Sequence, residues 1–195
     1  MQKIYVFADE KEQAYKTAEK IFDLQKNPEN LTELIKTASK TNDFKKIEDL
    51  EKSKQTNDKV LYEIANAYYA NGNFATAKEK LEKALNINSE NENALVLLGK
   101  IYFDESNFEK SKEIFNSFPK TTENQEILNY LGLFALEDMK FIEAIKYFSK
   151  ASNIDKKKSK YLYNLGNAYF YNGWIKEAIQ AYAQAICMSP ENLGY

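Results

Sequence analysis

The chain has 195 residues, and its 27 basic and 29 acidic side chains give a formal net charge of −2 at pH 7. This balance leaves no basic excess to bind nucleic acid and no acidic tail. The absence of histidine and the single cysteine exclude a histidine-based catalytic triad, a histidine-ligated metal and an internal disulfide. The 44% hydrophobic content is enough for the core of one domain or a short solenoid.

The first 27 residues predict one helix, from about Asp9 to Lys26, that ends before Pro28. The preceding apolar patch from Ile4 to Ala8 is too short for a secretory signal. The predicted helix resembles the second helix of a repeat whose first helix is missing or reduced to Ile4 to Phe7. The longest uncharged run, Tyr161 to Ile175, is too short and too polar to span a membrane.

Residues 28 to 57 predict a degenerate helix pair around an Asn42-Asp43 turn. Ile35 occupies the position where later units have glycine or alanine, and this pair is about thirty residues long. We therefore expect residues 1–57 to form a degenerate N-terminal helical segment or cap.

A fixed period then follows, marked by one small residue in each unit: Ala65, Gly99, Gly132 and Gly166. The steps are 34, 33 and 34 residues, which is typical of stacked helical hairpins. The predicted units cover residues 58–192 as 58–91, 92–124, 125–158 and 159–192, and a tail of 193–195 remains. In the second unit, Pro119 is expected to end the second helix early.

The turns within the units carry residues suited to ending one helix and capping the next. Gly72 and Gly173 can adopt positive φ, and Asn73 and Asn107 can accept hydrogen bonds from exposed backbone N–H groups.

The last unit, Ser159 to Asn192, is the clearest. Its Leu165-Gly166-x-x-Tyr169 run, Ala178-x-x-x-Tyr182 run and closing Pro190 resemble the tetratricopeptide repeat (TPR). The resemblance implies an all-α fold, a right-handed superhelix of antiparallel helix pairs (a TPR solenoid), and a role in protein binding. It implies no particular partner.

In TPR superhelices the first helix of each unit faces the concave side. By register, the resemblance assigns to a partner-binding groove the residues Tyr62, Asn66, Tyr69, Val96, Lys100, Phe103, Asn129, Leu133, Tyr163, Asn167 and Phe170. Several of these aromatic residues could instead pack against neighbouring first helices. Ile179 and Ile186 are apolar where a further unit would begin, and they are expected to form an edge contact with another helix, a second copy or a partner.

We expect no catalytic residues, no metal site and no cofactor. Cys187 has no base near it in sequence and is interpreted as a packing residue or a bystander. The predicted function is a scaffold or adaptor that binds a protein or peptide segment, with no nucleic acid and no membrane span. The alternatives are a self-associating subunit of a fixed complex, with a homo-oligomer formed through the C-terminal edge, or the TPR part of a larger enzyme or signalling protein. The sequence favours a cytoplasmic location, and export requires that an N-terminal signal was removed.

Overall fold

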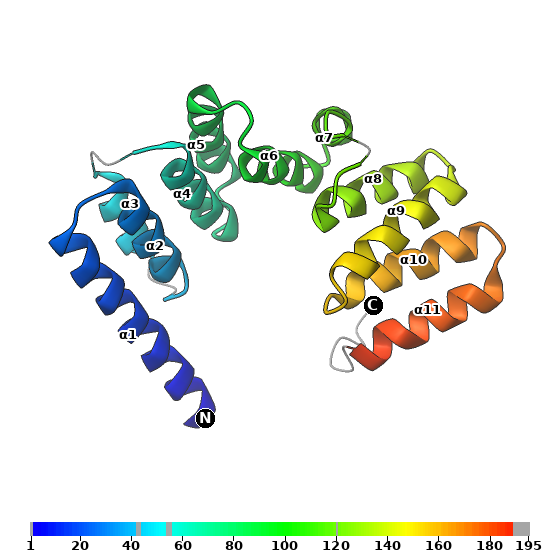
Figure 1. Ribbon diagram of the computed structural model, residues 1–195, viewed down its shortest axis with the longest axis horizontal. Coiled ribbons are helices and arrows are strands. Elements are labelled where there is room, and N and C mark those ends of the chain that lie inside the picture. Colours follow the sequence, from blue (N-terminus) through cyan, green and yellow to red (C-terminus); the bar gives the residue numbers. More distant parts are fainter. Residues whose placement is uncertain (1, 42–43, 54–55, 120, 189–195) are drawn as a thin grey trace. The chain divides into compact units, whose positions relative to one another are not determined.

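The computed structural model describes residues 2–41, 44–53, 56–119 and 121–188. These residues form eleven α-helices and contain no strand (Figure 1). The predicted all-α fold is therefore confirmed. The Asn42-Asp43 turn, Pro190 and the predicted tail 193–195 lie outside the described residues.

The chain divides into two compact units, Met1–Ser106 and Asn107–Tyr195. This boundary falls inside the predicted repeat 92–124. The first helix of that repeat packs against helices of the first compact unit, and its second helix packs against the second compact unit.

The first compact unit contains α1 (Gln2–Leu24), α2 (Pro28–Ser39), α3 (Phe44–Glu51), α4 (Asp58–Ala70), α5 (Phe74–Ile87) and α6 (Glu92–Asp104). Helix α1 begins before Asp9, so the residues from Ile4 to Ala8 belong to the same helix and do not form a reduced first helix. The helix ends before Pro28, as predicted. Helix α3 has 8 residues whereas α5 has 14, which accounts for the shorter length of the degenerate pair.

The second compact unit contains α7 (Phe108–Asn116), α8 (Gln125–Glu137), α9 (Phe141–Ile154), α10 (Ser159–Tyr171) and α11 (Ile175–Met188). Helix α7 has 9 residues and ends three residues before Pro119, as the sequence predicts. Helices α8 and α9 pack as one hairpin, α10 and α11 as the next, and α9 packs against α10.

Asparagine side chains begin the first helices of three successive repeats. The Oδ1 atoms of Asn57, Asn91 and Asn124 accept hydrogen bonds from backbone N–H groups in the first turns of α4, α6 and α8, over 2.8, 3.0 and 2.9 Å. The corresponding residue before α10 is Lys158, and it makes no side-chain capping bond. Asn73 and Asn107 cap α5 and α7, as predicted.

The turns between paired helices use the left-handed backbone region. Gly72 and Gly173 have φ angles of 77° and 83°. Ser106 and Met139 stand at the equivalent positions and adopt φ angles of 60° and 58°, although L side chains disfavour this region.

In two hairpins a glycine on the first helix lies directly against a ring on the second helix. A Cβ at Gly132 would lie 2.6 Å from a ring atom of Phe148, and one at Gly166 would lie 2.5 Å from the ring of Tyr182. These approaches are too close for any side chain larger than hydrogen. At the same register α4 buries Ala65, which is larger than glycine, and α5 buries Leu81, which is smaller than phenylalanine or tyrosine.

The degenerate pair, α2 and α3, has a third combination of residues at this register. Ile35 is fully buried on α2, and the aligned position on α3 is Glu51, which carries no ring or branched side chain.

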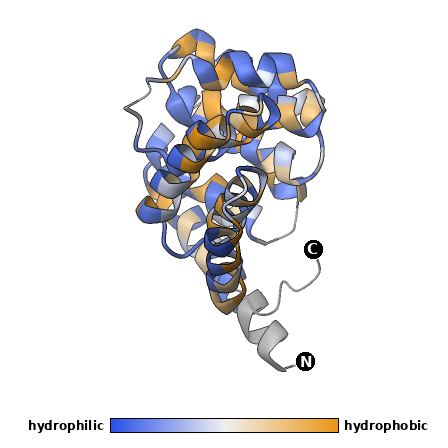
Figure 2. Cartoon of the chain, turned by 90° about the vertical axis from the view of Figure 1, so that its right-hand side faces the viewer, coloured by the Kyte–Doolittle hydropathy of each residue, from blue (hydrophilic) through white to orange (hydrophobic). Residues whose placement is uncertain are grey.

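The buried side chains form the core along the hairpins. In the second compact unit one cluster consists of Ala135, Ala144, Phe148, Leu165, Ala168 and Ala181. Figure 2 shows hydrophobic and hydrophilic residues alternating around the helices, as expected where each helix buries one stripe.

Candidate functional site

The predicted groove residues of the second compact unit lie on α8 and α10. Tyr163 and Phe170 are 37% and 54% exposed, whereas Asn129 is 5% exposed and Leu133 is half-buried. Asn164 donates from Nδ2 to Oδ1 of Asn129 over 2.8 Å, a bond that ties α10 to α8. In this unit the groove prediction thus includes Asn129, whose side chain offers little surface.

The remaining asparagine of this set is also engaged within the chain. The Tyr182 hydroxyl donates to Oδ1 of Asn167 over 2.7 Å, and the ring of Tyr182 lies 5.6 Å from that of Tyr163. Helix α11 thus orients both side chains on α10.

Aromatic side chains gather at the end of α10. Tyr171 is 62% exposed, and its ring stacks on Phe141 at 6.1 Å and meets Phe170 edge-on at 5.7 Å. Trp174, interpreted as a packing residue at the turn, stacks on Tyr169 at 5.9 Å and keeps 46% of its surface exposed. This end of α10 is therefore an exposed apolar surface on a rigid helix.

The predicted groove residues of the first compact unit lie on α4 (Tyr62, Asn66, Tyr69) and α6 (Val96, Lys100, Phe103). The Tyr69 hydroxyl donates to Asp104 over 2.7 Å, and the Lys100 Nζ lies 5.6 Å from the centre of the Tyr69 ring. Val96 is 6% exposed and mostly contributes to packing. Tyr62, Asn66, Lys100 and Phe103 are half-buried.

A polar pocket of about 240 Å³ lies beside Tyr62. Asp58 accepts hydrogen bonds from the side chains of Asn88 and Asn91, both over 2.9 Å, and the bond from Asn88 is the main cause that lowers the pKa of the Asp58 carboxyl. Burial raises the pKa of Glu63, which faces Lys36 at 3.6 Å. The carboxylates in this pocket are thus matched by donors and cations of the chain itself.

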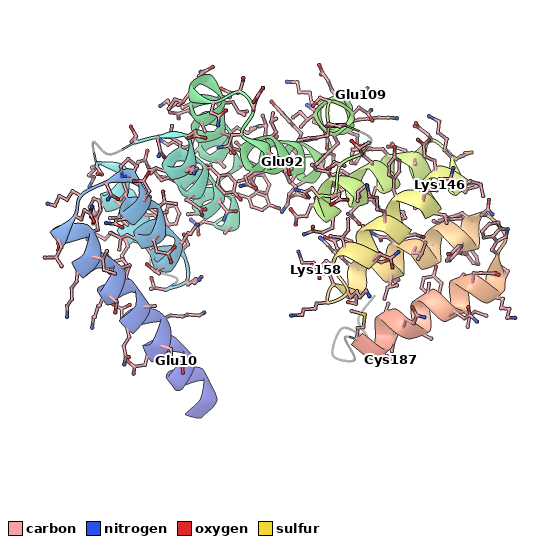
Figure 3. The ribbon with its side chains drawn as sticks, viewed as in Figure 1. Glu10, Glu92, Glu109, Lys146, Lys158 and Cys187 are labelled. Atoms are coloured by element: carbon pink, nitrogen blue, oxygen red, sulfur yellow. The ribbon has the colours of Figure 1, made fainter. Side chains whose placement is uncertain are left out.

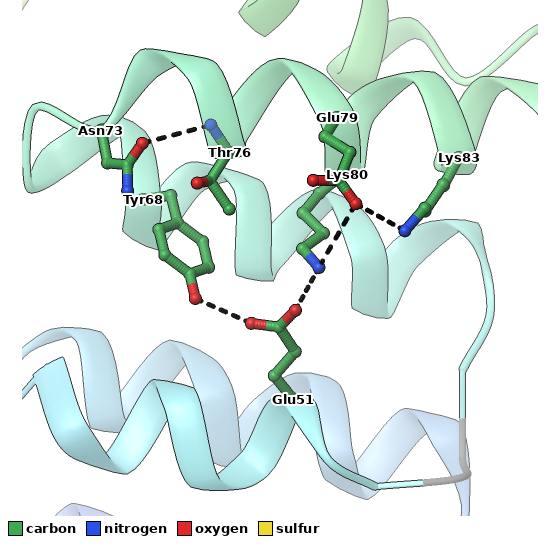
Figure 4. A network of polar contacts seen from close by, with 7 residues as sticks. All are labelled: Glu51, Tyr68, Asn73, Thr76, Glu79, Lys80 and Lys83. Atoms are coloured by element: carbon green, nitrogen blue, oxygen red, sulfur yellow. Dashed lines mark hydrogen bonds and ion pairs between the residues drawn. The ribbon is translucent and has the colours of Figure 1, made fainter.

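A polar network not anticipated from the sequence joins α3 to the next hairpin (Figure 4). Tyr68 donates to Glu51 over 2.8 Å, and Lys80 pairs with the other carboxylate oxygen of Glu51. Burial, followed by the bond to Glu51, raises the pKa of Tyr68 to about 12. The network holds the degenerate pair to the next one.

A hollow of about 720 Å³ runs along α9 past Phe141, Lys146 and Lys150. Lys146, labelled in Figure 3, is exposed, and Lys150 donates to the carbonyl of Thr122 over 2.7 Å. Cys187 lies near the end of α11 and is exposed, so of its two interpretations the bystander fits and the packing residue does not (Figure 3).

Three further features bear on the predicted sites. Ile179 and Ile186 on α11 are 63% and 50% exposed. Within the described ranges, no three histidine, cysteine or acidic side chains come together as metal ligands would. None of the helices in those ranges combines the length and the apolar character needed to cross a bilayer.

Comparison with known proteins is consistent with these repeats. Family models described as tetratricopeptide repeat match residues 68–131 and 159–192. No curated protein sequence matches the chain.

Several solved structures share the fold. A chain in the crystal structure of the APC/C hetero-tetramer Cut9–Hcn1 superposes with a TM-score of 0.79 at 18% identity, over 95% of this chain and 38% of that one. BtubC from P. vanneervenii gives 0.67 at 18% identity, over 98% and 92% of the two chains. PilF from Pseudomonas aeruginosa gives 0.64 at 17% identity, over 93% and 78%. The chain thus spans less than half of the Cut9–Hcn1 chain that it resembles, and at these identities the likeness concerns the fold.

Proposed function

Since this chain belongs to the tetratricopeptide repeat family, whose members serve as protein-interaction scaffolds, we propose that it binds a segment of a partner protein along the exposed face of its first helices. The observation that supports this binding mode most strongly is the exposure of Tyr163, Phe170 and Tyr171 on α10. Large aromatic side chains left in contact with water on one helix are the usual anchors of protein interfaces.

The helix that carries these rings is held firmly. Gly166 lets the Tyr182 ring pack directly on the α10 backbone, and the bond from Asn164 to Asn129 fixes α10 against α8. A partner segment would therefore meet a surface that is already ordered, and little entropy would be lost on binding.

The proposal is tested with a partner identified by copurification and then purified. Phe170→Ala is expected to weaken its affinity by about tenfold or more, as for an anchor residue, with an unchanged melting temperature. Ile154→Ala, which truncates an exposed apolar side chain on α9, is the matched control and should leave the affinity unchanged. If Phe170→Ala binds like the wild type, or lowers the melting temperature as much as the core change Phe148→Ala, the groove assignment fails.

A second function is favoured by the exposed apolar edge of α11. We infer that Ile179 and Ile186 would support self-association, because exposed apolar side chains on one helix gain from being covered. Sedimentation at several concentrations should show an oligomer for the wild type and a monomer for the Ile179→Glu, Ile186→Glu double variant. A wild type that stays monomeric at all concentrations would exclude this function.

A further inference from the structure

A pocket of about 300 Å³ lies among α2, α3 and α4, away from the polar pocket beside Tyr62. Its floor is buried and apolar, and its rim is more exposed. Among the described residues, those that line it are uncharged: Ala38, Ser39, Phe44, Ile47, Ala67, Ala70 and Asn71. For scale, a dry cavity of about 150 Å³ accommodates benzene, so the space suffices for one aromatic side chain.

In the next repeat, the position equivalent to this pocket is occupied by an aromatic ring of the chain itself. Counting thirty residues onward from Phe44 and Ser39 gives Phe74 and Tyr69. The Tyr69 ring stacks on Phe74 with centroids 5.7 Å apart and an interplanar angle of 26°. Its hydroxyl reaches Asp104, which occupies the place of Ala70.

The second compact unit fills this place from the opposite helix. Phe141 begins α9, as Phe44 begins α3, and Tyr171 of the following first helix stacks on it at 6.1 Å and 20°. By register Tyr171 corresponds to Ala70. A stacked tyrosine therefore covers the phenylalanine at both places, although it comes from a different helix in each.

At Phe44 the two positions that could supply this tyrosine are Ser39 and Ala70. The ring contact that Phe44 makes among the described residues is an edge contact with Tyr68, at 4.9 Å and 78°. The residues at both positions that could stack on Phe44 are thus small, and the adjacent pocket is large enough for one aromatic side chain.

We propose that this pocket binds the aromatic side chain of a tyrosine or phenylalanine in a partner protein, stacked on Phe44 as Tyr69 stacks on Phe74. The uncharged lining disfavours a lysine or arginine guest, since a buried cation without a carboxylate is costly. At the rim the Asn71 amide can hydrogen-bond a phenol. Ser39 is already committed, because its hydroxyl donates to the carbonyl of Ile35 over 2.9 Å. The proposal does not depend on the face of α10.

The test uses three small probes: 4-methylphenol, the peptide acetyl-Gly-Tyr-Gly-amide and its counterpart acetyl-Gly-Ala-Gly-amide. Carbon-13 labelled alanine and isoleucine methyl groups report binding by NMR. The phenol and the tyrosine peptide are expected to shift the methyl signals of Ala38, Ile47, Ala67 and Ala70 saturably in the millimolar range, and the alanine peptide is not. A wild type without saturable shifts, or shifts from the phenol but not from the tyrosine peptide, would overturn the proposal.

Two variants fill the pocket in the two ways that the chain already uses. Ser39→Tyr copies Tyr69, and Ala70→Tyr copies Tyr171, so each should abolish the shifts, and either suffices if the other does not fold. Conversely, Tyr69→Ser should create a second site beside Phe74, with new saturable shifts at Ala77 and Ile101. Retained binding in a folded Ser39→Tyr or Ala70→Tyr variant, or no second site in Tyr69→Ser, would contradict the assignment.

Discussion

The close approach of Gly132 and Phe148 makes a quantitative prediction about how a hairpin is closed. In Gly132→Ala the new Cβ would lie 2.6 to 2.9 Å from three ring atoms of a fully buried side chain. Overpacking of this kind costs about 1–3 kcal/mol, and the better helix propensity of alanine returns up to about 1 kcal/mol. We expect a net loss of about 1–2 kcal/mol in the free energy of unfolding.

The steric overlap in Gly132→Ala should be relieved by a leucine at position 148, which gives the alanine and leucine combination found at Ala65 and Leu81. Phe148→Leu alone should cost about 1–2 kcal/mol through lost burial, but in Gly132→Ala the smaller leucine makes room for the new methyl group. The double variant should therefore be more stable than the sum of the single effects predicts, by about 1–2 kcal/mol.

Urea unfolding followed by circular dichroism measures all four corners of this cycle. Gly132→Ala combined with Ile154→Ala, an exposed site on the same helix as Phe148, is the control and should be additive. Additivity within about 0.5 kcal/mol for the Gly132 and Phe148 pair would show that the contact does not close the hairpin as described.

Four further changes test other features. Lys158→Asn should raise the free energy of unfolding by about 1 kcal/mol in urea titrations by supplying the cap that the earlier first helices have, and Lys158→Ala should not. Met139→Gly should stabilise by about 0.5–1 kcal/mol because it relieves a positive φ at an exposed side chain; a lower melting temperature would contradict this. Tyr161→Phe removes a fully buried hydroxyl for which the described residues provide no hydrogen-bond partner, so stability should stay equal or rise, and a loss above about 1 kcal/mol would reveal an unseen partner. The raised pKa of Tyr68, about 12 against an ordinary 10.0, means that the unfolded chain releases this proton first. Its contribution to the free energy of unfolding, roughly 2 kcal/mol, is therefore present below pH 10 and lost as the pH rises to 12. Between pH 10 and 12 the free energy of unfolding should accordingly fall less steeply with pH in Tyr68→Phe than in the wild type.

Local signals in the sequence predicted several helix ends, caps and turns well. Gly132 and Gly166, two of the residues that mark the period, meet a steric requirement at their hairpins, and Pro119 shortens α7 because proline cannot continue the helix. The start of α1 was missed, because the apolar stretch from Ile4 to Ala8 has no polar alternation to mark it as part of the longer helix.

The surfaces were harder to predict than the helices. Register places Asn129 and Tyr163 on the same face, yet the first is buried and the second is exposed, because burial depends on how neighbouring first helices pack. The bond from Tyr68 to Glu51 joins residues on two different hairpins, and no periodic pattern announces it. The stacking position over Phe44 can be recognised only from the structure, which shows where the rings of Tyr69 and Tyr171 lie at the equivalent positions.

The different ways of closing the hairpins limit how such a chain can be recombined. Gly132 lies against a ring, Ala65 is aligned with a leucine, and the buried Ile35 is aligned with Glu51. A genetic crossover in the turn between paired helices would join, for example, an alanine first helix to a phenylalanine second helix and leave one methyl group too many. A crossover in the loop that follows a second helix keeps each matched pair together. The hairpin, and not the single helix, is thus the smallest segment of this chain that duplication or domain shuffling can move without a compensating mutation.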